Sequence, residues 1–236
     1  MRVLIPWRLL MLMLPLGLTA GCSDGPMFAL KSLNPYYRRQ WARDAAMGPT
    51  YYDRIAELRQ LRSTIGGMPP ADQDRWLELV ASIVQEDPSI EMRREAVLAA
   101  GETRRPLAVE ILQAASQDES EKVRMAVCAA AQKQDPADAM PMLQTLIRDE
   151  DTHGVKPQAI LALGKFDSPQ SRTLLAEALA ERSPAIQLAA TQALGEATGQ
   201  PYGGDVAKWK SYLAGEAVEP TQVSVATRAA EMLRLR

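Results

Sequence analysis

Few residues of this chain could carry out chemistry, and the main candidates gather around one histidine. His153, the only histidine, closely follows Asp149, Glu150 and Asp151. Carboxylates beside an imidazole could hold a metal ion, but such a run of acids is also typical of a solvated turn between helices. One histidine allows no Ser/His/Asp or Cys/His arrangement, and a catalytic site needs several convergent groups. The sequence therefore predicts no catalytic residue, no metal site, no cofactor and no small-molecule substrate.

A short apolar stretch near the N-terminus predicts export. Arg2 and Arg8 give this stretch a positive start, residues 9–18 are apolar, and small residues follow before Cys22. Such a run is too short for an ordinary membrane span and is typical of a secretory signal. We therefore expect residues 1–21 to be a signal peptide.

The residues that end this signal, Leu18–Cys22, resemble the lipobox of bacterial lipoproteins. The resemblance implies that Cys22 is acylated, with palmitate among its acyl chains, and becomes the mature N-terminus. One departure is Thr19, which stands where that family has an apolar residue, so a plain signal peptide cleaved near Ala20 is the alternative. Ser23 rather than Asp follows the cysteine. By the same resemblance, this favours a lipid anchor in the outer membrane, facing the periplasm, over one in the inner membrane.

Charge and cysteine content narrow the classes of partner. The formal net charge is −2, which gives no electrostatic reason to expect nucleic acid. If Cys22 is acylated, Cys128 is the remaining cysteine and no internal disulfide can form. Cys128 stands among alanines, which favours a small buried thiol over a reactive one.

A pattern of apolar and small residues recurs four times along the rest of the chain. Its first residues, here called the anchors, are Met92, Val123, Val155 and Ile186, at intervals of 31, 32 and 31 residues. The residues four, seven and eight positions after each anchor are also apolar or small, so they share one helical face. A fixed period of this length indicates stacked pairs of helices rather than one globular core.

Capping residues and prolines indicate where the helices begin. A side chain with an acceptor oxygen precedes a proline at four places, which is typical of a helix N-terminus. These four residues are Asp87, Asp135, Ser168 and Ser183. Before the first anchor, Trp76 is expected on the buried face of a helix with Leu77 and Val80.

A glycine-rich loop at residues 198–205 lacks the spacing of phosphate-binding loops. Asp205 is expected to cap a short helix bearing Trp209 and Tyr212, which would cover the open apolar face of the last unit. A ligand site in this loop is the alternative.

Charged residues recur in phase with the pattern. The residue after each anchor is basic in three units and Gln187 in the fourth, and an acid precedes each anchor by five or six positions. We expect these residues to link the turns of adjacent units as a charge ladder, and a basic binding stripe is the alternative. The ladder residues are Asp87, Arg93, Asp118, Arg124, Glu150 and Lys156.

A turn acid followed by Val-Arg-x-x-Ala-x-x-Ala-Leu-Gly, on a period near 31, resembles the short HEAT-like repeat also named after phycobilisome lyases. The resemblance covers residues 72–196, and a degenerate unit is expected at 53–66. It implies an all-α fold, a right-handed superhelix (α-solenoid) of about four to five helical hairpins. Because this repeat serves scaffolds, assembly factors and enzyme accessory domains alike, it implies no particular activity.

The second helix of each hairpin is expected to line a curved groove. Helical geometry places the residues two positions after the anchors opposite the buried face. These groove residues are Arg94, Met125, Pro157 and Leu188. The residues nine positions after the anchors, among them Gly101 and Gly164, are expected in the same groove. Because these residues are mostly uncharged, the groove is predicted to bind a helix or an extended peptide of a protein partner.

The predicted organisation is a signal peptide at 1–21, a tether at 22–52, the repeats at 53–197 and a C-terminal capping segment at 198–236. The expected function is that of a membrane-tethered, protein-binding scaffold or assembly factor of the bacterial cell envelope. One alternative is a structural subunit of a larger envelope assembly. The other, suggested only by the name of the repeat, is a lyase-type or other cofactor-handling enzyme accessory.

Overall fold

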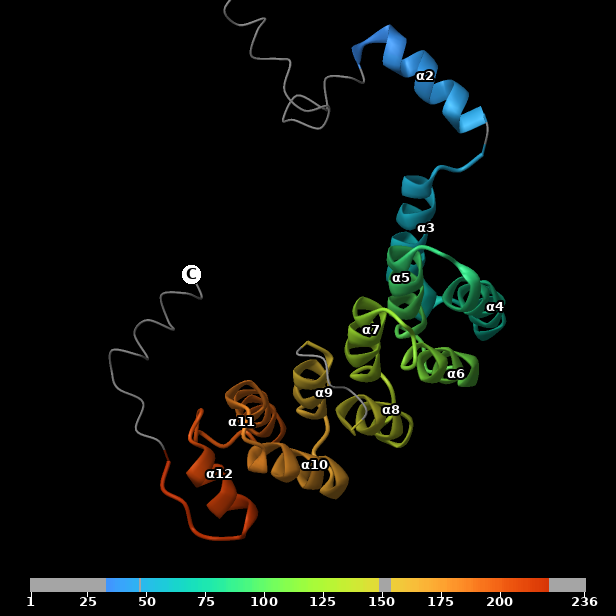
Figure 1. Cartoon of the computed structure of the whole chain (residues 1–236). Coiled ribbons are helices and arrows are strands. Elements are labelled where there is room, and N and C mark those ends of the chain that lie inside the picture. The colour runs from blue at the N-terminus through green and yellow to red at the C-terminus, as the bar shows by residue number, and fades with distance from the viewer. Residues whose placement is uncertain (1–32, 47, 149–153, 221–236) are drawn as a thin grey trace, which may run out of the picture. The chain divides into compact units, whose positions relative to one another are not determined.

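A computed structural model of the chain describes residues 33–46, 48–148 and 154–220 (Figure 1). In this part of the chain there are eleven α-helices and one 3₁₀ helix, η3, and no strand. The helices are α2 Pro35–Ala46, α3 Tyr51–Thr64, η3 Ile65–Gly67, α4 Pro70–Glu86, α5 Ile90–Ala100, α6 Pro106–Ala115, α7 Glu121–Ala131, α8 Pro136–Arg148, α9 Val155–Leu163, α10 Pro169–Ala180, α11 Pro184–Thr198 and α12 Val206–Leu213. The chain divides into two compact units, one ending at Asp53 and the other beginning at Arg54.

The first unit contains α2, which lies within the segment predicted to be a tether. Asn34 precedes this helix, and its Oδ1 accepts a hydrogen bond from the backbone N–H of Tyr36 at 2.9 Å. Tyr37 and Trp41 lie one helical turn apart, with ring centroids separated by 6.3 Å. Trp41 and Tyr36 are both exposed to solvent.

The second unit is a stack of helical hairpins. The pairs α4–α5, α6–α7, α8–α9 and α10–α11 each pack together, and each second helix packs on the second helix of the next pair. Figure 1 shows α5, α7, α9 and α11 following one another along one side of this stack, with α4, α6, α8 and α10 along the other. The predicted all-α repeat fold, an α-solenoid, is confirmed.

The repeated pattern forms the core of the stack. The anchors and the residues four, seven and eight positions after them are all buried, and the most exposed of them, Ile186, shows 6 % of its surface. Alanine occupies most of these positions, which lets the helix backbones approach closely. The periodicity of the sequence therefore specifies the buried faces of α5, α7, α9 and α11 correctly.

Two glycines allow successive second helices to come into contact. A Cβ atom on Gly101 would lie 2.5 Å from the Cβ of Ala130, and one on Gly164 would lie 3.0 Å from the Cα of Ala193. Both glycines are buried against the next unit rather than exposed. The prediction that they line the groove is therefore wrong, because the space they leave is filled by the neighbouring helix.

The predicted helix starts are correct in most cases. Ser168 caps α10, since its Oγ accepts a hydrogen bond from the N–H of Ser171 at 3.1 Å, while α8 and α11 begin at the expected prolines. The start predicted at Asp87 is wrong, because α5 begins at Ile90 with Ser89 as its N-cap. Asp87 instead accepts a bond from the N–H of Ser89 at 2.9 Å, so it shapes the turn that precedes the cap.

Helix α12 packs against α10 and α11 at the C-terminal end of the stack. Asp205 caps it, as predicted, accepting bonds from the N–H groups of Ala207 and Lys208, both at 3.1 Å. Trp209 is completely buried and lies edge-on to Tyr202, with ring centroids 5.0 Å apart. This helix therefore shields the last hairpin from solvent, while residues 221–236 of the predicted capping segment lie outside the described residues.

Candidate protein-binding surface

The charge ladder is best defined at Arg93, where a buried guanidinium joins two units. Its Nε and Nη2 donate to the two carboxylate oxygens of Asp118 at 2.8 and 3.1 Å, and its Nη1 donates to the backbone carbonyl of Asp87 at 3.0 Å. The side chains of Arg93 and Asp118 are both 8 % exposed. The hydrogen bonds to Asp118 raise the pKa of Arg93 above its ordinary value, so this residue is a permanently charged link between α5 and the turn before α7.

The next two basic residues of the ladder, Arg124 and Lys156, also contact residues of the turns. Arg124 donates to the backbone carbonyl of Asp118 at 2.6 Å, and Lys156 forms an ion pair with Glu181 at 3.0 Å. Gln187 continues the series without charge, donating to the carbonyl of Glu181 at 2.7 Å. Glu150 lies outside the described residues. The described basic groups of the ladder are thus engaged with the turns and do not form an open basic stripe.

Helix α3 extends these contacts toward the N-terminal end of the stack, which the sequence pattern did not indicate. Arg54 pairs with Asp87 at 2.8 Å, Arg59 with Glu95 at 3.3 Å, and Arg62 with Glu102 at 3.3 Å. These pairs join residues 33, 36 and 40 positions apart, so only the Arg54–Asp87 spacing is close to the repeat period of 31 or 32. Because α3 also carries no copy of the alanine pattern, the sequence contained little signal for these pairs.

Glu95 is a buried carboxylate within this cluster. Its side chain is 4 % exposed, and Oε1 takes part in ion pairs with Arg59 and with Arg94 at 2.9 Å. Its Oε2 is buried and has no hydrogen-bond partner. Because Arg94 also pairs with Glu91 at 2.7 Å, its charge is satisfied by its own helix. Arg94 is consequently a poor candidate for an open contact with a partner.

The remaining predicted groove residues occupy equivalent positions on successive second helices. Met125 on α7 is partly buried and packs against the core, and Pro157 on α9 is also half-buried. Leu188 on α11 is 53 % exposed, which is high for a leucine. The residues two positions after the anchors of α7, α9 and α11 are therefore uncharged, and Leu188 is the one of them that is open to solvent.

Of the other chemical candidates, Cys128 is among the described residues. It is a buried thiol on α7 whose Sγ donates to the carbonyl of Arg124 at 3.6 Å, and Cys22 and His153 lie outside the described residues. Within the described ranges, no group of three or more His, Cys, Asp or Glu side chains is placed to hold a metal ion. No helix in those ranges is long and apolar enough to span a bilayer.

Comparison with known families supports the assignment from the repeats. A family model for HEAT repeats matches residues 77–156 and again residues 112–195, which together span half of the chain. No match is found among the curated proteins. The stacked hairpins, the in-phase contacts and the family match agree, and the chain belongs to the HEAT-repeat family.

Proposed function

We propose that this chain is a protein-binding scaffold or assembly factor, anchored by lipid at Cys22 to the outer membrane of a bacterium and facing the periplasm. HEAT repeats commonly mediate interactions between proteins, which supports the general role. The observation that carries it here is Leu188 on α11, which is 53 % exposed, with uncharged residues at the equivalent positions of α7 and α9. Under this proposal the chain binds its partner and catalyses no reaction.

The surface that Met125, Pro157 and Leu188 form on α7, α9 and α11, here called the inner face, can be tested by adding charge to it. Replacing Met125 and Leu188 together by Glu is expected to reduce recovery of bound envelope proteins more than tenfold, because each carboxylate would be desolvated in an apolar contact. Recovery would be measured by cross-linking in whole cells, purification and quantitative mass spectrometry.

A matched control places the same charges on the first helices. Gln113 on α6 and Gln170 on α10 are both exposed, so the double change Gln113→Glu with Gln170→Glu should leave recovery unchanged. Circular dichroism would show that both variants remain helical. Equal recovery with the Met125/Leu188 variant and the wild type would remove the inner face as the binding surface.

The lipid anchor requires its own test. Replacing Cys22 by Ser is expected to abolish incorporation of labelled palmitate and to release the exported chain from the membrane fraction, since several acyl chains together provide stable anchoring. Cys128→Ser is the matched control. Because the thiol that it removes is buried, this variant should keep both the palmitate label and the membrane association. Incorporation of palmitate into the Cys22→Ser protein, or no incorporation into the wild type, would contradict the proposal of a lipid anchor at Cys22.

A further inference from the structure

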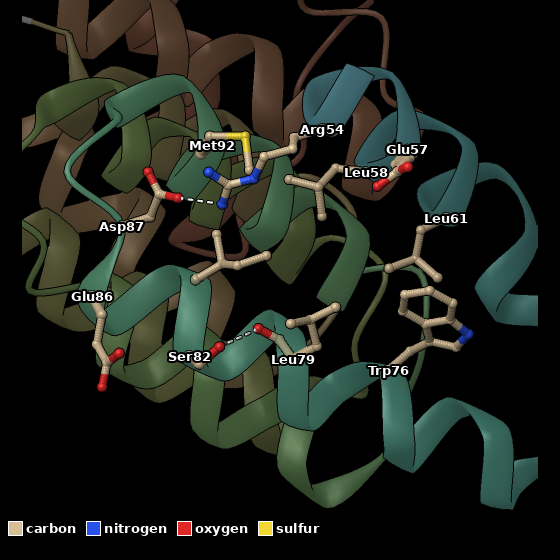
Figure 2. Close-up of a pocket in the computed structure, with 11 residues that line it drawn as sticks. Arg54, Glu57, Leu58, Leu61, Trp76, Leu79, Ser82, Glu86, Asp87 and Met92 are labelled. Atoms are coloured by element: carbon tan, nitrogen blue, oxygen red, sulfur yellow. Dashed lines mark hydrogen bonds and ion pairs between the residues drawn. The ribbon is translucent and has the colours of Figure 1, made fainter. Parts of the chain in front are cut away.

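A groove lies between α3 and α4 at the N-terminal end of the second unit (Figure 2). Its volume is about 310 Å³, and Leu58 and Leu61 of α3 face it from one side. Trp76 and Leu79 line it from α4, and they are 42 % and 49 % exposed. The expectation that Trp76 is buried is therefore wrong, because no described helix of the second unit covers it. Two large apolar side chains at the edge of one groove mark a contact surface.

The period of the stack indicates what shape would fill this groove. Each of the second helices α5, α7, α9 and α11 packs against the first helix of its own hairpin. Helix α3 stands where a second helix would stand, since Arg54 contacts Asp87 as Arg93 contacts Asp118. No helix precedes α3 within the unit that begins at Arg54. The open groove is thus at the position that the first helix of another hairpin would take. A helix is therefore the element whose shape fits the groove.

The charges around the groove indicate the character of that helix. Asp87 is neutralised by Arg54, but Glu57 and Glu86 are exposed and form no ion pair with any described residue. Glu86 is also the last residue of α4, where the helix dipole adds negative potential. The rim therefore carries two unneutralised negative charges above an apolar floor. A complementary helix has an apolar face flanked by basic side chains.

We propose that the α3–α4 groove binds a protein partner through a basic amphipathic helix. The helix inserts leucine or aromatic side chains against Trp76 and Leu79, and places lysine or arginine beside Glu57 and Glu86. This proposal rests on the proposed protein-binding function. It adds a second contact surface, separate from the inner face on α7, α9 and α11, together with the chemistry of the segment that it recognises.

Two synthetic peptides test the proposal on the exported chain, residues 22–236, with Cys22→Ser to prevent acylation. Both peptides are 18-residue amphipathic helices with the same Leu and Trp face, one flanked by lysines and the other by glutamates. By fluorescence anisotropy at low salt, the lysine peptide is expected to bind about tenfold more tightly than the glutamate peptide. This preference should shrink as salt is added, because the rim charges are exposed.

Variants of the groove should separate the apolar and the charged contributions. Leu79→Glu is expected to weaken the lysine peptide at least tenfold, and it should fold normally because Leu79 is half-exposed. Glu57→Lys with Glu86→Lys should reverse the preference and bind the glutamate peptide more tightly. Gln170→Glu places the same carboxylate at an exposed position of α10 outside the groove, and it should leave the binding of both peptides unchanged.

The outcomes against the proposal are distinct. Equal affinity for the two peptides, no measurable binding, or equal weakening by Leu79→Glu and Gln170→Glu would overturn it. Self-association that Leu79→Glu abolishes would identify a second copy of the chain as the occupant and would also overturn it. Unchanged envelope partners in the Met125/Leu188 variant would instead count against the inner face, because that variant leaves the groove intact.

Discussion

Replacing Arg93 by Met is expected to lower the free energy of unfolding by about 3 kcal/mol, since removing one partner of a buried ion pair leaves the other charge uncompensated. The substitution keeps an unbranched apolar stem but removes the guanidinium that Asp118 and the carbonyl of Asp87 share. Asp118, whose side chain is 8 % exposed in the wild type, would then lose the guanidinium that donates to both of its carboxylate oxygens. Urea unfolding followed by circular dichroism would measure the change.

Two comparisons separate the buried charge from a general loss of contacts. Arg172→Met removes an exposed pair with Asp167 and should change the free energy of unfolding much less than Arg93→Met does, because solvent screens an exposed pair. Adding Asp118→Asn to Arg93→Met should recover at least half of the loss, because a neutral amide can stay buried and still accept from the N–H of Ser120. A loss below about 1 kcal/mol for Arg93→Met would show that the ladder does not hold the units together.

The effect of Arg93→Met should not depend on pH near neutrality. The pKa of Arg93 is raised by its hydrogen bonds to Asp118, so its contribution to stability is fully present below the ordinary arginine value. That contribution is lost only as the pH rises through the still higher value in the folded state. Unfolding measured at pH 6 and pH 9 should therefore give the same difference between variant and wild type, as far as Arg93 is concerned.

Replacing Trp209 by Ala should destabilise the C-terminal end of the stack by about 3 to 5 kcal/mol, the usual cost of truncating a buried tryptophan. Trp209 is completely buried between α12 and the last hairpin, and its Nε1 donates to the carbonyl of Gly203 at 2.8 Å. The loss should appear as faster amide hydrogen exchange in α10, α11 and α12, with smaller changes in α4 and α5. A stack in which units contact only their neighbours confines such damage.

Trp76 provides the matched control for this change. Because its side chain is 42 % exposed, Trp76→Ala should cost no more than about 1 kcal/mol. Trp209→Phe should fall between the two, since it keeps an aromatic ring beside Tyr202 but loses the bond to Gly203. If Trp209→Ala and Trp76→Ala had equal effects, α12 would not be a stabilising cap.

The parts of the fold that the sequence predicted well share one cause. A side chain on a regular helix faces the same way every three or four residues, so the anchors and the alanines after them specify both the helices and their buried faces. Ser168 and Asp205 were identifiable as caps because their acceptor oxygens act locally. These are short-range properties, and each can be inferred from the few residues around it.

The parts that were wrong depend on neighbours that the local sequence does not reveal. Gly101 was expected in the groove, yet its hydrogen atom is what leaves room for Ala130 of the next helix. Trp76 has the spacing of a buried residue, but burial requires a covering helix, and none of the helices described in the second unit lies over it. The α3–α4 groove combines residues from 54 to 92, so no single motif contains it.

Successive hairpins meet through the contacts of α5 with α7, of α7 with α9 and of α9 with α11, and weaker contacts of α4 with α6, of α6 with α8 and of α8 with α10 lie beside them. The junctions between units therefore form a series. Tension applied between α4 and α12 must therefore pass through every one of these junctions in turn. Each junction can yield by a small tilt while its own hairpin stays folded, so the stack is expected to lengthen under load as a spring does. Shortening the array by one 31-residue unit would remove one such junction and make the spring stiffer.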